Sequence, residues 1–323
     1  MSSPVWWDRP HPMRWMLLPL SALYALGWGL YRLTYALKIK QSKRLHSPII
    51  CVGNYRVGGT GKTPFVRWLA FRCQQLGKSV VLSTSGYGSP RAEAATLAPE
   101  GELDAKEWGD EAALLRLALP QVPIIVGRRR TLAAQICHKH FPESLLIMDD
   151  GLQHLPLAKD VTIVLDPPGT NPFCLPAGPY RENRLFRGKA SLVMPSRDFH
   201  LVRDPMYLFQ REPLKTGRKV ELMICAIARP EQFIEQAKMA GFEWQRQVIL
   251  ADHAGITNQD LAGNGGLALC TAKDWVKIKE LSEAARYDWI VADYDHEVRE
   301  GEEFLAWLIS ELGKIDGAIS KAN

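Results

Sequence analysis

GGTGKTP, at residues 58–64, is the stretch of sequence that decides the fold. The apolar residues IICV (49–52) precede it and predict a buried strand, while residues 63–76 carry apolar side chains at helical spacing. A glycine-rich turn between a strand and a helix is typical of a phosphate-binding loop, because its backbone N–H groups turn inward around phosphate oxygens. Lys62 is expected to reach the β- and γ-phosphates, and Thr63 to hold Mg²⁺. The predicted nucleotide-binding residues of this loop are Gly58, Gly59, Thr60, Gly61, Lys62 and Thr63.

Strands and helices alternate along the rest of the chain. Strands are predicted at residues 79–83, 122–126, 145–148 and 161–165, and helices at 110–119 and 131–140. Such strand, helix, strand units make parallel sheets, so we expect an α/β fold of the P-loop NTPase type with helices on both faces. A second cycle begins near residue 220 and predicts a smaller α/β domain. The expected division is an N-terminal membrane-associated helix at 1–40, a P-loop domain at 41–190 and a smaller domain at 191–323.

Two aspartates end the apolar strand LLIMDD (145–150). A P-loop protein needs a carboxylate for its metal at the end of a neighbouring strand, and this segment resembles a Walker B strand. Adjacent carboxylates repel each other unless a cation or a donor offsets their charge, which favours metal binding. Asp149 and Asp150 are therefore predicted metal ligands, with a turn or N-cap role as the alternative for one of them.

Composition and charge exclude several classes of protein. The chain has 323 residues, 46% of them hydrophobic, and 40 Lys and Arg residues against 35 Asp and Glu residues. These values describe a folded protein rather than a disordered or collagenous one. The net charge of +5 is small for this length and argues against a nucleic-acid partner. Six scattered cysteines form no C-x-x-C pair, so neither a zinc site nor a disulfide framework is indicated.

The N-terminal segment is unusually apolar. Residues 15–31 carry no charge and are rich in Trp and Tyr near both ends. Their length is at the lower limit of roughly 17 residues for a membrane span, and a helix lying in the membrane interface is the close alternative. Basic residues follow the segment, which by the positive-inside rule predicts that the bulk of the chain is cytoplasmic. These basic residues are Arg32, Lys38, Lys40, Lys43 and Arg44.

The chain resembles the tetraacyldisaccharide 4′-kinases, the lipid A kinases, over nearly its whole length. The two most specific motifs are GNYRVGGTGKTP (53–64), whose P-loop has Arg56 where the first glycine usually stands, and DDGLQH (149–154). The other matching segments are SGYG (85–88), WGDEAALL (108–115), LPAGPYRE (175–182), AIARPEQF (226–233), Asp252-His253 and TAKDWVKI (271–278).

The resemblance implies transfer of the ATP γ-phosphate to the 4′-hydroxyl of a tetraacylated disaccharide 1-phosphate. It implies ATP and Mg²⁺ as cofactors, an acylated disaccharide lipid as substrate, and a location at the cytoplasmic face of the bacterial inner membrane. Asp110 matches the position of the family's general base, and His253 matches its partner histidine. A carboxylate oriented by an imidazole suits this chemistry, because a sugar hydroxyl is a poor nucleophile until it loses its proton. Lys62 completes the predicted catalytic set.

Further site residues are predicted with an alternative for each. Glu182 is a candidate Mg²⁺ ligand and Arg181 a candidate phosphate contact, unless both belong to a solvated run of charges. Arg128, Arg129 and Arg130, which follow a predicted strand, are candidate phosphate contacts, with a helix-surface alternative for at least one of them. His154 is expected either to touch the nucleotide or the metal, or to serve as a capping group. Asp110 has the alternative of a helix N-cap.

The sequence departs from the family pattern at three positions. Ser85 stands where the family commonly has arginine, Ala254 replaces the second histidine of D-H-H, and Ala272 replaces the glutamate of T-E-K-D. These positions lie outside the predicted phosphate-binding core, so we expect an active kinase. A membrane-recruited P-loop ATPase or switch acting on a protein partner is the alternative function. A soluble kinase of small metabolites does not account for residues 15–31.

Overall fold

The larger of two sheets contains the predicted P-loop. The computed structural model describes residues 4–8, 10–45, 47–203, 207–208, 218–294 and 296–320. The sheet has the strand order β3-β4-β2-β5-β1-β6-β7 and is parallel except for the β3/β4 pair. Its strands are β1 (Ile49–Gly53), β2 (Val80–Thr84), β3 (Thr96–Leu97), β4 (Ile124–Val126), β5 (Leu145–Asp149), β6 (Val161–Leu165) and β7 (Leu192–Met194). The predicted α/β fold with a mostly parallel sheet is confirmed.

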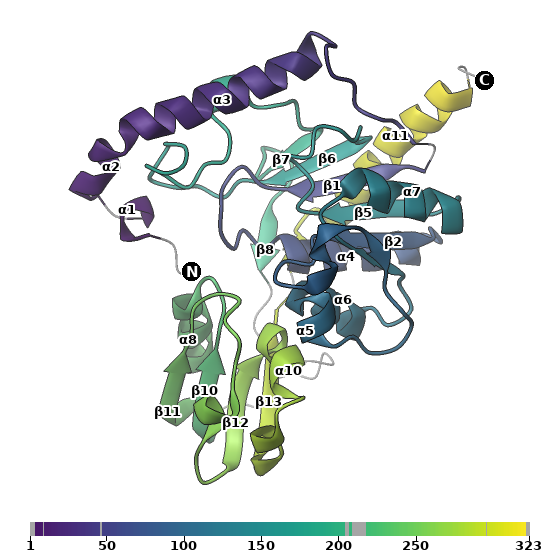
Figure 1. Ribbon diagram of the computed structural model, residues 1–323. Helices are drawn as coiled ribbons and strands as arrows, with labels where there is room; N and C mark the ends of the chain where they lie inside the picture. Colours follow the sequence, from purple (N-terminus) through teal and green to yellow (C-terminus); the bar gives the residue numbers. More distant parts are fainter. Residues whose placement is uncertain are drawn as a thin grey trace.

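Helices cover both faces of this sheet, as its apolar strands require. On one face Phe65 of α4 (Lys62–Gln75), Leu115 of α6 (Asp110–Ala118) and Phe304 of α11 (Gly301–Ser320) share one buried core. On the other face α7 (Arg130–His140) contributes Ala133 and Cys137 to a second core. The short helices α5 (Ala105–Trp108) and η1 (Pro90–Glu93) connect β2 with α6. Figure 1 shows this lobe with α4 and α6 beside the sheet.

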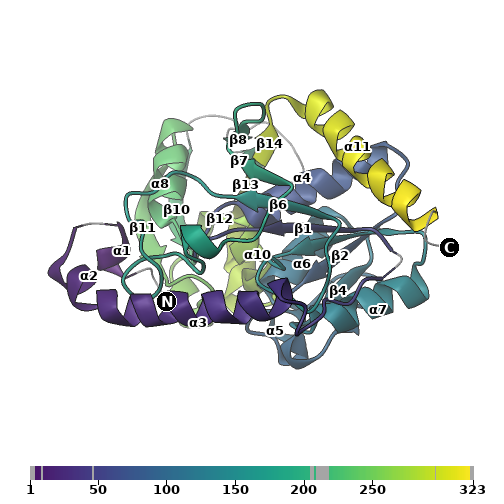
Figure 2. The ribbon, with the colours of Figure 1, turned by 90° about the horizontal axis from the view of Figure 1, so that it is seen from above.

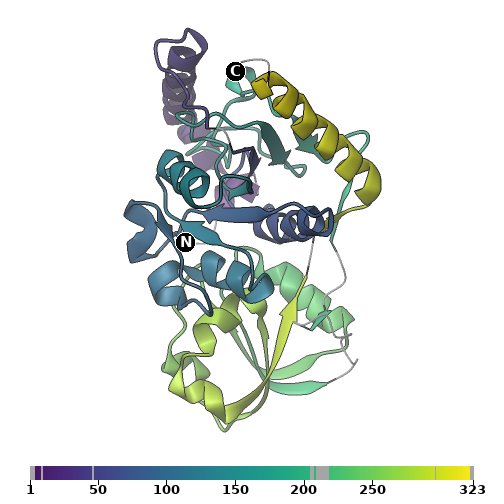
Figure 3. The ribbon, with the colours of Figure 1, turned by 90° about the vertical axis from the view of Figure 1, so that its right-hand side faces the viewer.

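The smaller lobe is a second α/β unit, a mostly parallel sheet with helices packed on it. Its sheet has the order β11-β10-β12-β13-β9, and only the β13/β9 pair is antiparallel. The strands are β9 (Tyr207–Leu208), β10 (Lys219–Cys225), β11 (Glu243–Ile249), β12 (Gly266–Thr271) and β13 (Tyr287–Asp293). The helices are α8 (Pro230–Met239), α9 (Asn258–Leu261), α10 (Ala272–Ile278) and η3 (Ser282–Arg286). Figure 3 shows the two sheets as separate lobes.

The two lobes are not divided at a single point of the chain. Strand β7 lies just beyond residue 190 but pairs with β6 in the larger sheet. After the smaller lobe the chain returns through β14 (His296–Val298), which pairs with β8 (Leu201–Arg203), to α11 on the larger lobe. The larger lobe thus takes in stretches that the predicted boundary assigns to residues 191–323. The boundary itself stays a prediction.

The N-terminal segment forms three helices instead of one. These are α1 (Val5–Asp8), α2 (Pro12–Met16) and α3 (Leu18–Ala36), and Figure 2 shows α3 along one edge of the molecule. No helix within the described ranges combines the length and apolar character that crossing a bilayer needs. The expectation of a membrane span at residues 15–31 is therefore not met. The run breaks at Leu17, and Ser21, Gly27 and Gly29 dilute the apolar character of α3.

Candidate active site

The P-loop connects β1 with α4, as its glycines predict. Gly61 occupies the N-cap position of α4 with a φ of 82°, a left-handed conformation that favours glycine. A Cβ atom at Gly61 would lie 1.7 Å from the imidazole of His296, whose Nδ1 hydrogen-bonds the Gly61 carbonyl at 3.0 Å. Inside the loop, the Asn54 amide donates to the Thr60 hydroxyl at 3.0 Å. Position 61 therefore accepts only glycine without displacing its neighbour.

The acidic end of β5 faces the start of α4. The hydroxyl of Thr63 donates to Oδ2 of Asp149 at 2.9 Å, and Nζ of Lys62 lies 3.9 Å from Oδ1 of Asp150. Arg181 donates to both carboxylate oxygens of Asp150, at 2.9 and 3.1 Å. The structure thus brings five of the predicted site residues together at one edge of the sheet.

The two aspartates differ in protonation because their surroundings differ. Burial raises the pKa of Asp149 to about 7, and the negative charge of Glu111 adds to this effect while Lys62 opposes it. Burial also acts to raise the pKa of Asp150, but the charges of Lys62 and Arg181 outweigh it and hold that pKa below its ordinary value. Asp150 is therefore the ionised member of the pair, and Asp149 keeps a proton more easily.

The same edge of the sheet contains a buried acceptor suited to a cation. Asp149 is 3% exposed, and its Oδ1 atom is buried without a hydrogen-bond partner among the described residues. A carboxylate oxygen beside a threonine hydroxyl is the type of donor set that Mg²⁺ takes in P-loop proteins. Across the described ranges, no three or more His, Cys, Asp or Glu side chains are grouped to hold a metal. Any Mg²⁺ here would therefore depend on hydroxyl, phosphate or water oxygens as well.

Glu182 is buried and is paired with the N-terminal helix. Its Oε2 atom accepts from Arg32 of α3 at 2.8 Å, and its Oε1 atom accepts from Gln153 at 2.8 Å. Gln153 also accepts from Arg181 at 3.2 Å, so Glu182 belongs to the network that reaches Asp150. The role of Glu182 as a metal ligand stays a prediction.

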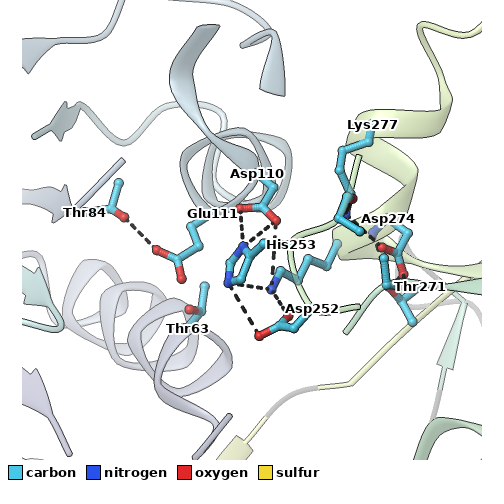
Figure 4. A network of polar contacts seen from close by, with 12 residues as sticks. Thr63, Thr84, Asp110, Glu111, Asp252, His253, Thr271, Asp274 and Lys277 are labelled. Carbon is cyan, nitrogen blue, oxygen red and sulfur yellow. Dashed lines mark hydrogen bonds and ion pairs between the residues drawn. The ribbon is translucent and has the colours of Figure 1, made fainter. Parts of the chain in front are cut away.

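Asp110 and His253 meet across the two lobes, although 143 positions separate them in the chain. Nδ1 of His253 lies 2.9 Å from Oδ2 and 3.1 Å from Oδ1 of Asp110, and Figure 4 shows the two side chains pointing toward each other. Asp110 begins α6, whereas His253 lies in a turn with a φ of 60°. A left-handed histidine is uncommon and is typical of functional sites. Figure 4 also places Thr63 of α4 in the same region.

Burial, hydrogen bonding and neighbouring charges have opposing effects on the pKa values of Asp110 and His253. Burial acts to raise the pKa of Asp110, but the hydrogen bond with His253 and the charge of Lys273 outweigh it and lower that pKa. The hydrogen bond with Asp110 raises the pKa of His253, against burial and the charge of Lys273. Asp110 is therefore held as a carboxylate, the form that a proton acceptor needs.

His154 and Arg128 stand apart from these contacts. Nε2 of His154 lies 3.1 Å from the hydroxyl of Thr131, and burial lowers the pKa of this histidine to about 4. The imidazole is thus uncharged at neutral pH. Arg128 is exposed at the end of β4. Whether either residue contacts a nucleotide stays a prediction.

Arg130, one of the three arginines predicted as phosphate contacts, lies beside the acidic pair. Arg130 is 3% exposed, donates to the Ser83 hydroxyl at 3.0 Å, and donates to the backbone carbonyls of Asp149 and Asp150. The sequence predicts all three arginines of residues 128–130 as candidates, and the structure leaves Arg128 exposed while Arg130 is buried. The signal for Arg130 is its place at the start of α7, where one side chain of the run turns toward the sheet.

The Arg56 departure has a local explanation. Its guanidinium lies over the ring of Tyr180 at 5.6 Å and within 3.5 Å of the carbonyl oxygens of Pro167 and Pro168. A Cβ atom on Gly169 would lie 2.3 Å from this guanidinium. The side chain therefore packs on the loop after β6. Nothing in the structure explains the replacements at Ser85, Ala254 and Ala272.

Comparisons with known proteins agree with this architecture. The chain is similar to a crystal structure described as the "apo" form of LpxK from Aquifex aeolicus in complex with ATP, with 24% sequence identity and a TM-score of 0.77. The match covers 93% of this chain and 99% of that chain, and at this identity it speaks for the fold. The family model of LpxK, tetraacyldisaccharide-1-P 4′-kinase, matches residues 13–313. The chain therefore belongs to the tetraacyldisaccharide-1-P 4′-kinase family, and it is a kinase.

Proposed function

We propose that the protein transfers the γ-phosphate of ATP to the 4′-hydroxyl of tetraacyldisaccharide 1-phosphate in lipid A biosynthesis. The observation that carries the proposal is the Asp110 to His253 contact at 2.9 Å, in the same region as Thr63 of the P-loop helix. A P-loop supplies phosphate binding in many ATPases and switches. A hydroxyl acceptor must also lose its proton, and a carboxylate paired with an imidazole from the other lobe can take that proton.

The proposed chemistry divides the work among three groups of residues. The backbone of residues 58–63 and the Lys62 ammonium bind the phosphates. The Asp110 carboxylate takes the 4′-hydroxyl proton as the O–P bond forms and the bond from the γ-phosphorus to the leaving oxygen breaks. His253 holds Asp110 through its Nδ1 hydrogen bond. General-base catalysis of this kind contributes a factor of about 10²–10⁴ in rate.

Mg²⁺ is part of the proposal. Thr63 and Asp149 would hold it, with Asp150 and Glu182 as the other candidates. The buried Oδ1 atom of Asp149, which has no hydrogen-bond partner in the described part of the chain, supports this assignment. When bound, the ion neutralises charge that develops on the phosphates.

We also propose that α3 attaches the protein to the cytoplasmic face of the inner membrane without crossing it. Its outer side exposes leucines, of which Leu23 is 65% and Leu30 is 55% exposed. Its inner side is tied to the protein by polar contacts, including Ser21 to the Cys174 carbonyl at 2.8 Å. An exposed apolar helix face followed by basic residues suits an anionic membrane surface.

The test uses full-length enzyme in detergent with Mg²⁺, labelled ATP and tetraacyldisaccharide 1-phosphate. We expect label in the lipid product at the 4′ position. Asp110→Asn is expected to lower turnover by about 10²–10⁴ while ATP binding, measured by calorimetry, is retained. ATP hydrolysis without labelled lipid would refute the proposal and favour the P-loop switch.

The membrane part has its own test. Wild type should co-sediment with vesicles of anionic lipid, and Leu23→Glu with Leu30→Glu should abolish sedimentation without changing the thermal melting curve. Ile309→Glu, at a 47% exposed leucine-sized side chain of α11, is the matched control and should sediment like wild type. Equal sedimentation of all three proteins would refute attachment through α3.

A further inference from the structure

A lysine completes the contact between Asp110 and His253. Nζ of Lys273, on α10, lies 3.3 Å from Nε2 of His253, 3.0 Å from Oδ1 of Asp252 and 3.9 Å from Oδ2 of Asp110. The lysine side chain is 22% exposed and that of His253 is 23% exposed, so both are largely shielded from solvent. The imidazole is therefore held between a carboxylate on Nδ1 and an ammonium on Nε2.

The hydrogen-bonding capacities of these groups fix where the proton of His253 lies. An ionised carboxylate only accepts hydrogen bonds, so Nδ1, at 2.9 Å from Asp110, carries a hydrogen. A lysine ammonium only donates, so Nε2, at 3.3 Å from Nζ, offers its lone pair to Lys273. An uncharged imidazole in the Nδ1–H tautomer satisfies both of these contacts.

We propose that Lys273 is a positioning residue, whose ammonium occupies Nε2 of His253, opposes a second proton there and so keeps the Nδ1–H of the imidazole directed at Asp110. The inference rests on the proposed base role of Asp110. A second proton on Nε2 would place an imidazolium against both Asp110 and the ammonium. Such a cation would stabilise the carboxylate and weaken it as a proton acceptor. Lys273 thus preserves the basicity of Asp110 through His253.

Charged groups from several described elements face the imidazole or its partners. Asp110 comes from α6, Lys273 from α10 and Asp252 from the same turn as His253, with its Oδ2 atom 3.7 Å from Nε2. The ring of Tyr87, from the loop after β2, lies 5.2 Å from the imidazole between ring centroids. Further out, Glu111 acts on Lys273 and Lys277 acts on Asp110 through their charges. Among these groups Lys273 is the cation in direct contact with Nε2.

The first test is a ¹⁵N NMR measurement on wild type, with a single variant used only to assign the signals. Protein labelled at histidine is titrated in detergent, and the His253 signals are assigned by their absence from the His253→Gln spectrum. Above the titration of the imidazole we expect a protonated Nδ1 and an unprotonated Nε2. The opposite tautomer would overturn the proposal.

The second test removes the lysine charge. Lys273→Met should raise the pKa of His253 by about one unit or more, because a cation that opposes protonation is gone. Lys273→Arg keeps the charge and should leave that pKa within about 0.3 units of the wild-type value. Lys279→Met is the matched control on the same segment, since Lys279 pairs with Glu102 at 2.6 Å instead. An unchanged or lowered pKa in Lys273→Met would overturn the proposal.

Kinase assays connect this result with turnover. In Lys273→Met the acid limb of kcat against pH should move upward with the pKa of His253, so activity falls about tenfold more at about pH 6.5 than at about pH 8.5. Asp110→Asn separates the base role of Asp110 from the effect of Lys273 on His253. Wild-type turnover in Asp110→Asn would refute the base role alone, because the pKa of His253 in Lys273→Met is measured without turnover. An acid limb that stays in place while the pKa of His253 moves would refute the link from Lys273 to Asp110.

Discussion

Replacing Asp149 with asparagine is expected to stabilise the metal-free protein at neutral and alkaline pH. Burial raises the pKa of this carboxyl to about 7 in the folded chain, from an ordinary value of 3.8. Between these two values the folded protein holds a proton that the unfolded chain has lost. The free energy of unfolding of wild type therefore falls as the pH rises through this window, and the loss is complete above the folded pKa. An asparagine side chain at this position has no charge to bury, so the variant escapes this loss.

The size of the effect follows from the two pKa values. Each pKa unit corresponds to about 1.4 kcal/mol. The penalty on wild type is about 2 kcal/mol at pH 5, where the unfolded carboxyl is already ionised, and about 4 kcal/mol at pH 8. The stability advantage of Asp149→Asn should thus grow by about 2–3 kcal/mol between these pH values.

Urea unfolding followed by tryptophan fluorescence measures this difference, with detergent and EDTA held constant. Asp150→Asn is the matched control, because the pKa of Asp150 is lowered and the carboxyl pairs with Arg181 at 2.9 Å. The ionised Asp150 carboxylate stabilises the folded protein above the pKa that it has in the unfolded chain, and this contribution is lost as the pH falls below that value. Asp150→Asn should therefore be less stable than wild type at about pH 8. Asparagine tolerates the φ of 55° at that position. A gap for Asp149→Asn that is equal at the acidic and the alkaline pH would show that Lys62 keeps Asp149 ionised, against our reasoning.

Three further substitutions test the packing around the site. Gly61→Ala places a methyl group 1.7 Å from the His296 imidazole at a φ of 82°, and ATP affinity by calorimetry should fall at least about tenfold; unchanged affinity would contradict the loop geometry. Arg32→Gln leaves the fully buried Glu182 carboxylate without its charged partner and should lower the free energy of unfolding by about 2 kcal/mol, so equal stability would mean that the pair contributes nothing. Phe304→Ala empties a fully buried position of α11 and should cost about 3–5 kcal/mol, measured in urea; a cost below about 1 kcal/mol would show that α11 is dispensable to the larger core.

Much of the fold was predictable because its signals are local. Strand β6 begins and ends as the apolar pattern predicts, and α7 begins one residue earlier than expected. The glycines within residues 58–61 and the apolar strand before them identify the P-loop from a short run of consecutive residues. The acidic pair was predictable for the same reason, since parallel strands end at one edge of a sheet.

The contacts that complete the site were not predictable from local pattern. The pairing of Asp110 with His253 rested on the family resemblance, because the two residues lie on different lobes. In the sequence Lys273 is marked only as part of the matching segment 271–278, and its distance from Nε2 depends on how α10 packs against α6. Which of the three arginines at 128–130 lies beside the acidic pair depends on the direction in which each side chain leaves the turn after β4. Such directions are set by tertiary packing, which one sequence does not encode in any short window.

Helix α3 shows how a segment identified by its apolar composition also takes part in the site. Its Tyr24 hydroxyl donates to the Arg181 carbonyl at 3.0 Å, and its Arg32 pairs with Glu182 at 2.8 Å. Arg181 in turn binds Asp150, so two consecutive residues connect the helix with the acidic end of β5. A membrane span needs no such polar inner face. A helix that lies with one side on the protein and the other side exposed needs a polar inner face as well as an apolar outer face. The polar contacts of α3 therefore explain why its sequence is less apolar than a span, and why a change at Arg32 is expected to act on Glu182.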